Sequence, residues 1–197
     1  RFHERHGAGA NPLDLALWDA VEADHPGLFY RIAGAIHLAG GNIIDARIHT
    51  LKSGMALDNF LVQDPLGRPF MEESQLARLR TTIADALANR VKLVPQLAAR
   101  PLSRPRADAF TVRPRVEFDN KASNRFTVIE INGLDRIGLL YDLTEALYRL
   151  NLNIASAHVT TFGEKAVDVF YVTDLTGGKV TQAQRQATLK QNLLAVF

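Results

Sequence analysis

An internal repeat constrains the fold of this chain more than any other feature of its sequence. The segment Asp-His-Pro-Gly-Leu-Phe-Tyr at residues 24–30 returns 111 positions later as Asp-Arg-Ile-Gly-Leu-Leu-Tyr at residues 135–141. Identical residues continue at matching places after both segments, namely Asn42 and Asn153, Ile43 and Ile154, Ala46 and Ala157, Thr50 and Thr161, and Asp58 and Asp168. Similarity at a fixed spacing is the signature of a duplicated structural unit. We therefore expect two copies of one fold.

Hydrophobic periodicity predicts the same elements in each copy. Apolar residues at helical spacing follow the repeated segment, as at Leu28, Ile32 and Ile36, and alternating runs predict strands. For the first copy we expect strands at 13–23, 42–51 and 55–63 and helices at 28–39 and 72–94. For the second copy we expect strands at 126–132, 154–162 and 166–173 and helices at 138–150 and 181–197.

These elements predict an α+β chain with two ferredoxin-like domains in tandem. Each domain would have the order βαββαβ, with an antiparallel sheet and both helices on one face. The run from Phe110 to Phe118 would be the fourth strand of the first copy, and the second copy has no candidate for this strand. The expected organisation is a flexible tail at 1–12, domain 1 at 13–94, a Pro/Arg linker with the returning strand at 95–124, and domain 2 at 125–197.

Two details extend this expectation. Thr181 and Gln184 have the spacing of a capping box at the start of the last helix. The strand at 166–173 carries apolar residues on both faces, for example Val169 and Phe170, whereas a sheet with one face in water alternates more cleanly. We therefore expect the second face of the sheet to be covered by the other copy or by another chain.

Composition excludes several function classes. The 197-residue chain has a formal net charge of +2, no cysteine, and no apolar run near the roughly 20 residues that a membrane helix needs. Disulfide and thiolate chemistry are excluded, nothing calls for a nucleic-acid or membrane partner, and a cytoplasmic setting fits. The chain begins with Arg1 and not with Met, which suggests a piece of a longer polypeptide.

Three short motifs resemble functional sites but have simpler interpretations. The run from His3 to His6 lacks the i, i+4 spacing of a zinc-binding helix and belongs to the expected tail. The arginines between residues 100 and 115 come without an aromatic ladder for nucleic acid, so we interpret them as linker. The run from Thr176 to Lys179 lacks the glycine spacing of a phosphate loop and is expected to be a turn.

The repeated turn is the candidate site. Its glycine allows a backbone or a ligand to approach closely, and the free N–H groups of the helical turn that follows attract a carboxylate. Asp24 and Asp135 can cap their helices or accept an ammonium group, and Asn42 and Asn153 can pair with a side-chain amide. Plain structural roles stay open: caps for the aspartates, turn residues for the asparagines, and core for the apolar residues.

These residues resemble ACT domains, the small-molecule sensing modules of amino-acid metabolism. The resemblance rests on the paired Asp-x-x-Gly turns, the Asn-Ile pairs and the repeated Ala-x-Asp-x-Phe-x-Val strand, and it extends from about residue 13 to residue 197. In order and spacing, the two copies are similar to the C-terminal region of the bifunctional PII uridylyltransferase/uridylyl-removing enzymes. Ile137 departs from the pattern, because proline is common at that position.

The resemblance implies a glutamine sensor for nitrogen status. In that family a nucleotidyltransferase domain uses UTP and Mg²⁺ to uridylylate the PII protein, and an HD-type phosphohydrolase domain removes the group. Glutamine at the ACT region shifts the balance from transfer to removal. The chain lacks a Gly-Ser followed by Asp-x-Asp and lacks a His-Asp pair, so we expect a regulatory region without catalysis and without a cofactor of its own.

The resemblance also implies that ligands bind where such turns meet a strand, often between two modules. An alternative is an interaction module without a small ligand, for example a homodimer formed through ACT sheets. The candidate ligand-binding residues are Asp24, His25, Pro26, Gly27, Leu28, Phe29, Asn42 and Ile43 in the first copy, and Asp135, Arg136, Ile137, Gly138, Leu139, Leu140, Asn153 and Ile154 in the second.

Overall fold

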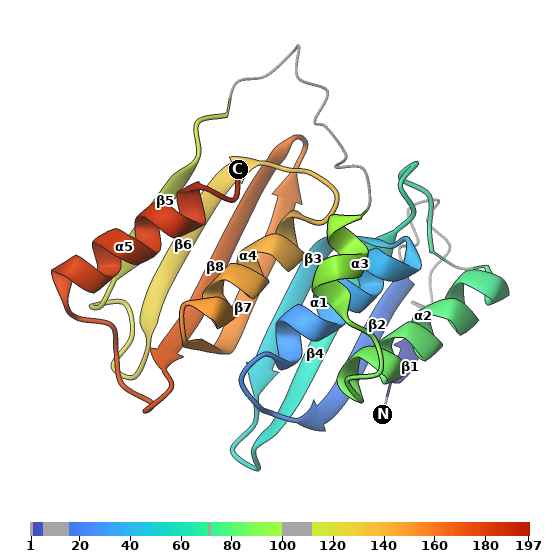
Figure 1. The fold of residues 1–197 in the computed structure, drawn as a ribbon, viewed down its shortest axis with the longest axis horizontal. Helices are drawn as coiled ribbons and strands as arrows, with labels where there is room; N and C mark the ends of the chain where they lie inside the picture. Colours follow the sequence, from blue (N-terminus) through green and yellow to red (C-terminus); the bar gives the residue numbers. More distant parts are fainter. Residues whose placement is uncertain (1, 6–15, 71, 100–111) are drawn as a thin grey trace.

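A computed structural model describes residues 2–5, 16–70, 72–99 and 112–197. The described residues form one antiparallel sheet of eight strands in the order β1-β2-β4-β3-β7-β8-β6-β5, with the helices on one of its faces (Figure 1). The strands are β1 Phe2–Arg5, β2 Ala16–Ala23, β3 Asn42–Thr50, β4 Met55–Gln63, β5 Arg115–Asp119, β6 Thr127–Leu134, β7 Leu152–Phe162 and β8 Lys165–Asp174. The helices are α1 Leu28–Ala39, α2 Glu73–Leu87, α3 Leu93–Ala98, α4 Leu139–Arg149 and α5 Ala183–Leu194.

The junction between β3 and β7 joins the two halves of the sheet. These strands pair antiparallel with Arg47 opposite His158, its own equivalent in the repeat. An interface in which equivalent residues face each other has two-fold symmetry. The Ser156 hydroxyl donates a hydrogen bond of 2.9 Å to the Ile48 carbonyl across the junction. The halves therefore lie edge to edge, and the expectation that one copy covers the second face of the other copy's sheet is wrong.

The core lies between the sheet and the helices. Phe60 on β4 and Phe170 on β8 hold equivalent positions and are fully buried. Ile36 on α1 and Leu147 on α4, also equivalent, are fully buried beneath the helices. The same apolar pattern thus produces the same packing in both halves of the chain.

The outer strands correct two expectations about the chain. Residues 2–5, expected in a flexible tail, form β1 and pair with β2, while residues 6–12 lie outside the described residues. The strand expected to return to the first copy is β5, which pairs with β6 in the second half. It buries Val116 completely there, and a short connection makes β5 and β6 neighbours in both sequence and space. In each described half, the outermost strand precedes the first helix of that half in the sequence. It does not follow the second helix, as the predicted βαββαβ order requires.

The expected helix at 72–94 is two helices. α2 ends near Ala88, where the next residue, Asn89, has a left-handed backbone with φ 56°, and α3 begins at Leu93. Pro95 lies in the first turn of α3, a place that tolerates a residue without an N–H group. The run of apolar residues at helical spacing concealed this break.

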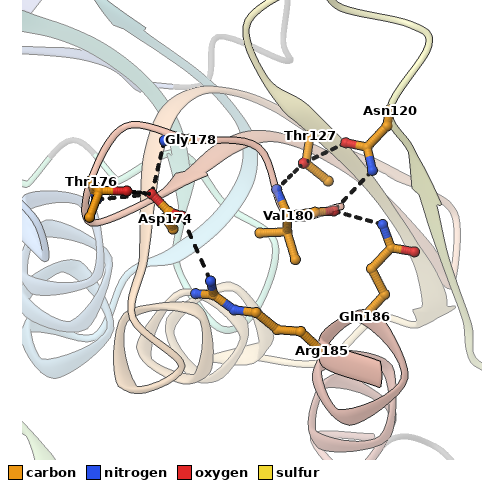
Figure 2. Close-up of polar contacts among 8 residues, drawn as sticks. All are labelled: Asn120, Thr127, Asp174, Thr176, Gly178, Val180, Arg185 and Gln186. Atoms are coloured by element: carbon orange, nitrogen blue, oxygen red, sulfur yellow. Dashed lines mark hydrogen bonds and ion pairs between the residues drawn. The ribbon is translucent and has the colours of Figure 1, made fainter. Parts of the chain in front are cut away.

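The capping box also lies elsewhere than expected. α5 begins after Gln182 without a side-chain cap, whereas Glu72 and Gln75 form a capping box at the start of α2. Figure 2 shows what holds the segment between β8 and α5. The Thr127 hydroxyl accepts the Val180 N–H at 2.8 Å, and the Asp174 carboxylate accepts the Gly178 N–H at 2.9 Å. The Thr176–Lys179 region is thus a turn, as expected.

The described helices include none with the length and apolar character needed to cross a bilayer.

Candidate ligand-binding site

Each repeated turn places a glycine directly before a helix. Gly27 and Gly138 have φ of 88° and 86°, a left-handed backbone that favours glycine, and neither helix start has a side-chain cap. In α4 the Leu139 N–H bonds the Arg136 carbonyl at 3.0 Å, and the Asp142 N–H bonds the Gly138 carbonyl at 3.1 Å. Within the described part of the chain, the N–H groups between these two bonds have no backbone acceptor.

The first aspartate of each turn does not cap its helix, so that interpretation is wrong. The Asp135 carboxylate instead accepts a hydrogen bond of 3.1 Å from the Thr161 hydroxyl on β7. In the first half, the Asp24 carboxylate accepts one of 2.9 Å from the Thr50 hydroxyl on β3. Both carboxylates are therefore held against the sheet. This leaves the start of each helix open to an external partner.

A second aspartate lies beneath each turn. Asp58 on β4 and Asp168 on β8 are equivalent residues, exposed by only 1% and 2%. The Oδ1 atom of each has no hydrogen-bond partner. Burial, followed by the charge of Asp24, raises the pKa of Asp58 to about 7. Burial, followed by the charge of Asp135, raises the pKa of Asp168 to about 8.

Each carboxyl group has a backbone hydrogen bond, from His49 to Asp58 and from Thr160 to Asp168, but its buried Oδ1 atom is costly to leave without a polar partner. The two buried aspartates are therefore the strongest indication of a ligand in the structure. Among the described residues, no group of three or more His, Cys, Asp or Glu side chains could hold a metal ion.

Two small cavities combine these groups with the opposite half of the chain. Each has a volume of about 20 Å³, room for about one water molecule. The first, which we call mouth A, joins the turn of the second half to the first half and is lined by Asp135, Arg136, Gly138, Leu139, Leu140, Tyr141, Val159, Thr161, Ala166 and Asp168 with Ala33, His37, Gly41, Asn42 and Ile43. The second, mouth B, is lined by Asp24, His25, Gly27, Leu28, Phe29, Tyr30, Ile48, Ala56 and Asp58 with Thr144, Tyr148, Leu152, Asn153 and Ile154.

The structure thus gathers the predicted residues into two reciprocal groups. Each group takes its turn from one half and its Asn-Ile pair from the other, because the halves are related by the two-fold arrangement at β3 and β7. Of the sixteen predicted residues, Pro26 and Ile137 line neither cavity. The apolar turn residues contribute to the core as well as to the cavities, with Leu28 exposed by 3% and Leu139 by 2%.

The charged residues that differ between the turns have other contacts. Arg136 pairs with Asp142 at 2.6 Å and donates to the Val196 carbonyl at 2.9 Å while lining mouth A. His25, at the equivalent position, is exposed, and its Nδ1 atom lies 3.1 Å from the Pro26 carbonyl oxygen. Of these two side chains, Arg136 is the one that an ion pair holds in place.

The lining residues that sequence reasoning did not predict as site residues include Asp58 and Asp168, and also His37 and Tyr148. The matched places of Asp58 and Asp168 in apolar strands were a signal for the first two. His37 and Tyr148 had no such signal, because they reach the cavities only when α1 packs beside α4. The rings of Tyr30 and Tyr148 mark that contact, with centroids 4.8 Å apart.

Part of the chain matches a known protein family. Residues 122–195 match the family described as the ACR family N-terminal ACT domain. The chain is 69% identical over 178 residues to the bifunctional uridylyltransferase/uridylyl-removing enzyme of Novosphingobium aromaticivorans, covering 90% of this chain and 20% of that enzyme. It is 60% identical over 193 residues to the enzyme of the same name from Erythrobacter litoralis, covering 98% of this chain and 20% of that enzyme.

A solved structure shares the fold. Aspartate kinase from Synechocystis matches with a TM-score of 0.50 and 16% identity, over 90% of this chain and 26% of that chain. The chain spans about a fifth of the length of the two curated relatives. Residues 122–195 of this chain thus match the ACT domain described for the ACR family, and over most of its length the chain is similar to bifunctional uridylyltransferase/uridylyl-removing enzymes.

Proposed function

We propose that this chain is the glutamine-sensing region of a cytoplasmic bifunctional uridylyltransferase/uridylyl-removing enzyme, and that it regulates the enzyme without catalysing a reaction. The observation that carries this proposal is the pairing, in each cavity, of an open helix start with a buried aspartate whose Oδ1 atom has no hydrogen-bond partner. An α-amino acid has a carboxylate and an ammonium group on one carbon, which matches this pair of features.

The chemistry of the ligand follows from the lining of mouth A. The carboxylate would accept from the N–H groups of Leu140 and Tyr141, where the helix dipole favours negative charge. The ammonium group would donate to Asp168 and Asp135. The side-chain amide needs a donor and an acceptor together, which Asn42 supplies from the other half.

The proposal also makes the first half of the chain an ACT domain, in tandem with the ACT domain of the second half. Support comes from the sequence repeat, from the same βαββ succession in both halves, and from the reciprocal cavities. A ligand in either cavity would contact both halves at once. Its binding would therefore depend on how the halves are oriented.

Regulation follows from the size of the cavities. A volume of about 20 Å³ does not hold an amino acid, so side chains at the junction between the halves must move when one binds. A ligand shifts a conformational equilibrium through its different affinities for the two states. Glutamine would thus favour one orientation of the halves. The uridylyltransferase and uridylyl-removing domains of the parent, acting with Mg²⁺ on the PII protein, would respond to that orientation.

Calorimetry tests this proposal. Glutamine, glutamate and asparagine are titrated into the chain, together with an Asp58→Asn/Asp168→Asn double variant as the matched control. The proposal expects saturable binding of glutamine that is at least about tenfold weaker in the double variant, since the ammonium loses its buried carboxylates.

A second candidate function is an interaction module that binds no small ligand. The β3–β7 junction favours it, because the halves already form one continuous sheet without help from a ligand. The same titration separates the two. Absence of heat with every amino acid, together with an unchanged melting temperature, would favour the interaction module and contradict sensing.

A further inference from the structure

We propose that the two mouths are coupled: one glutamine separates α1 from α4 and thereby opens both mouths, so that a second glutamine binds more tightly than the first. This inference rests on the proposed function and specifies how its site is regulated. Each mouth has more than an open helix start. Asp58 in mouth B and Asp168 in mouth A are exposed by only 1% and 2%, and each has an Oδ1 atom without a hydrogen-bond partner.

Helix α1 and its equivalent α4 each form part of both mouths. Residues 28–30 of α1 line mouth B, whereas Ala33 and His37, further along the same helix, line mouth A. In α4 the order is reversed, with residues 139–141 in mouth A and Tyr148 in mouth B. Because a packed helix moves as a rigid element, a displacement of α1 relative to α4 changes both mouths.

The two helices are in close contact beside each mouth. The rings of Tyr30 and Tyr148, which line mouth B, have centroids 4.8 Å apart. Tyr141, which lines mouth A, packs against Gly34 of α1, where an added Cβ atom would lie 2.7 Å from its ring. These contacts accompany the small volume of about 20 Å³ in each mouth. In the proposal, the contact between α1 and α4 loosens when an amino acid enters.

The pairing of β3 with β7 limits how the helices can separate. Five residue pairs join these strands, from Asp45 with Thr160 to His49 with Ser156. Sliding one half along the other, or turning it within the plane of the sheet, would break the hydrogen bonds of this pairing, and lost hydrogen bonds in a sheet are costly. Bending the sheet along the line between β3 and β7 keeps them. We therefore expect the halves to move by bending at this line.

Bending at this line opens the two mouths together. The described helices lie on one face of the sheet, so bending the halves away from that face moves α1 and α4 apart along their length (Figure 1). The mouths lie towards opposite ends of the junction, since mouth A contains Asn42 at the start of β3 and mouth B contains Asn153 near the start of the antiparallel β7. The second glutamine therefore meets a mouth that the first has already opened.

The coupling does not require identical mouths. Arg136 lines mouth A and pairs with Asp142 at 2.6 Å, whereas the equivalent residue in mouth B is the smaller His25. The two mouths can therefore have different affinities of their own. Coupling between two sites is reciprocal, so glutamine in either mouth raises the affinity of the other by the same factor.

A calorimetric titration of the 197-residue chain with glutamine measures this coupling. We expect two glutamines per chain, the second bound at least about tenfold more tightly than the first, with a Hill coefficient of about 1.5. The single variants Asp58→Asn and Asp168→Asn form a matched pair, because each weakens one mouth. Each variant should bind one glutamine in the same concentration range, with a Hill coefficient near that of a single site.

A distance measurement tests the opening itself. The chain has no cysteine, so Thr81→Cys on α2 and Thr188→Cys on α5 provide two unique positions for spin labels. Both threonines are exposed, and their helices flank α1 and α4 on opposite sides (Figure 1). Glutamine at saturation should lengthen the distance between the labels. It should do so equally when Asp58→Asn leaves mouth A as the only strong site.

Failure of this inference is distinguishable from failure of the proposed function. Two glutamines that bind independently, one glutamine per chain at saturation, or a label distance that no longer lengthens in Asp58→Asn would overturn the coupling and leave the sensing function intact. Binding of no amino acid at all would overturn the sensing function and the coupling with it. Circular dichroism checks that the variants fold, and the Hill coefficient of the unaltered chain decides the matter if one does not.

Discussion

Asp168 and Asp135 share the wall of one cavity, where burial and, second to it, the charge of Asp135 raise the pKa of the Asp168 carboxyl group to about 8. Asp58 and Asp24 repeat the relationship in the other half, where the pKa of Asp58 rises to about 7. Both halves therefore keep a carboxyl group that binds its proton near neutral pH. This relationship makes stability and ligand binding depend on pH.

Stability should decrease as the pH rises. A carboxyl group whose pKa is raised on folding holds its proton in the native state over a range where the unfolded chain has released it. The free energy of unfolding should therefore fall from about pH 4 up to about pH 8, where Asp168 has also ionised, by an amount on the order of a few kcal/mol. Urea unfolding at several pH values measures this slope.

The control for this prediction is the Asp58→Asn/Asp168→Asn double variant. It should lose most of the slope between pH 5 and pH 8, because asparagine does not titrate there, and it should exceed the parent chain in stability at about pH 8. Equal slopes in the two proteins would show that these carboxyl groups titrate normally.

The Thr127 hydroxyl should stabilise the connection between β8 and α5. Thr127 is fully buried, donates to the Asn120 side chain at 2.7 Å and accepts the Val180 N–H at 2.8 Å. Thr127→Val keeps the shape but leaves a buried N–H without its acceptor, so chemical denaturation should show a loss of about 1–3 kcal/mol.

Thr188→Val is the matched control for this substitution. Thr188 is exposed on α5, and its hydroxyl donates only to the Gln184 carbonyl one turn earlier. Its replacement should change the free energy of unfolding by less than about 0.5 kcal/mol. Equal effects at the two positions would contradict the role assigned to Thr127.

The packing of the Phe197 ring should require a glycine at position 133. A Cβ atom added to this glycine of β6 would lie 2.0 Å from Cε1 of Phe197. Gly133→Ala should therefore destabilise the chain by about 1–3 kcal/mol, because the ring must leave its place. In a Phe197→Ala background the same substitution should have almost no effect, and a double-mutant cycle measures the difference. Equal penalties in both backgrounds would exclude the ring as the cause.

The repeat predicted most of the fold because it reports packing that is local to each half. The helix over 28–39 and the strand over 55–63 have the predicted bounds, since apolar spacing and flanking glycines define them. The outer strands were assigned wrongly, because the residues of β5 do not by themselves show which half this strand pairs with. Edge pairing depends on connection lengths and neighbours, which periodicity does not encode.

The candidate site was predictable in part for the same reason. The turns and the Asn-Ile pairs are repeated in the sequence, so the repeat identified them as candidate site residues. The cap interpretation of Asp24 and Asp135 was wrong, because hydroxyls on neighbouring strands hold both carboxylates. His37 and Tyr148 depend on how α1 lies against α4, a contact between halves that no pattern within either half reveals.

The most direct test of the account is the number of protons released when glutamine binds. Asp168 holds its proton at pH 7, and an ammonium group bound beside it would favour the ionised form. Calorimetry at pH 7 in two buffers of different ionisation enthalpy should therefore show release of up to about one proton per glutamine, with affinity that increases as the pH approaches about 8. Equal heats in the two buffers and an affinity independent of pH would contradict binding of the amino acid at this buried carboxyl group.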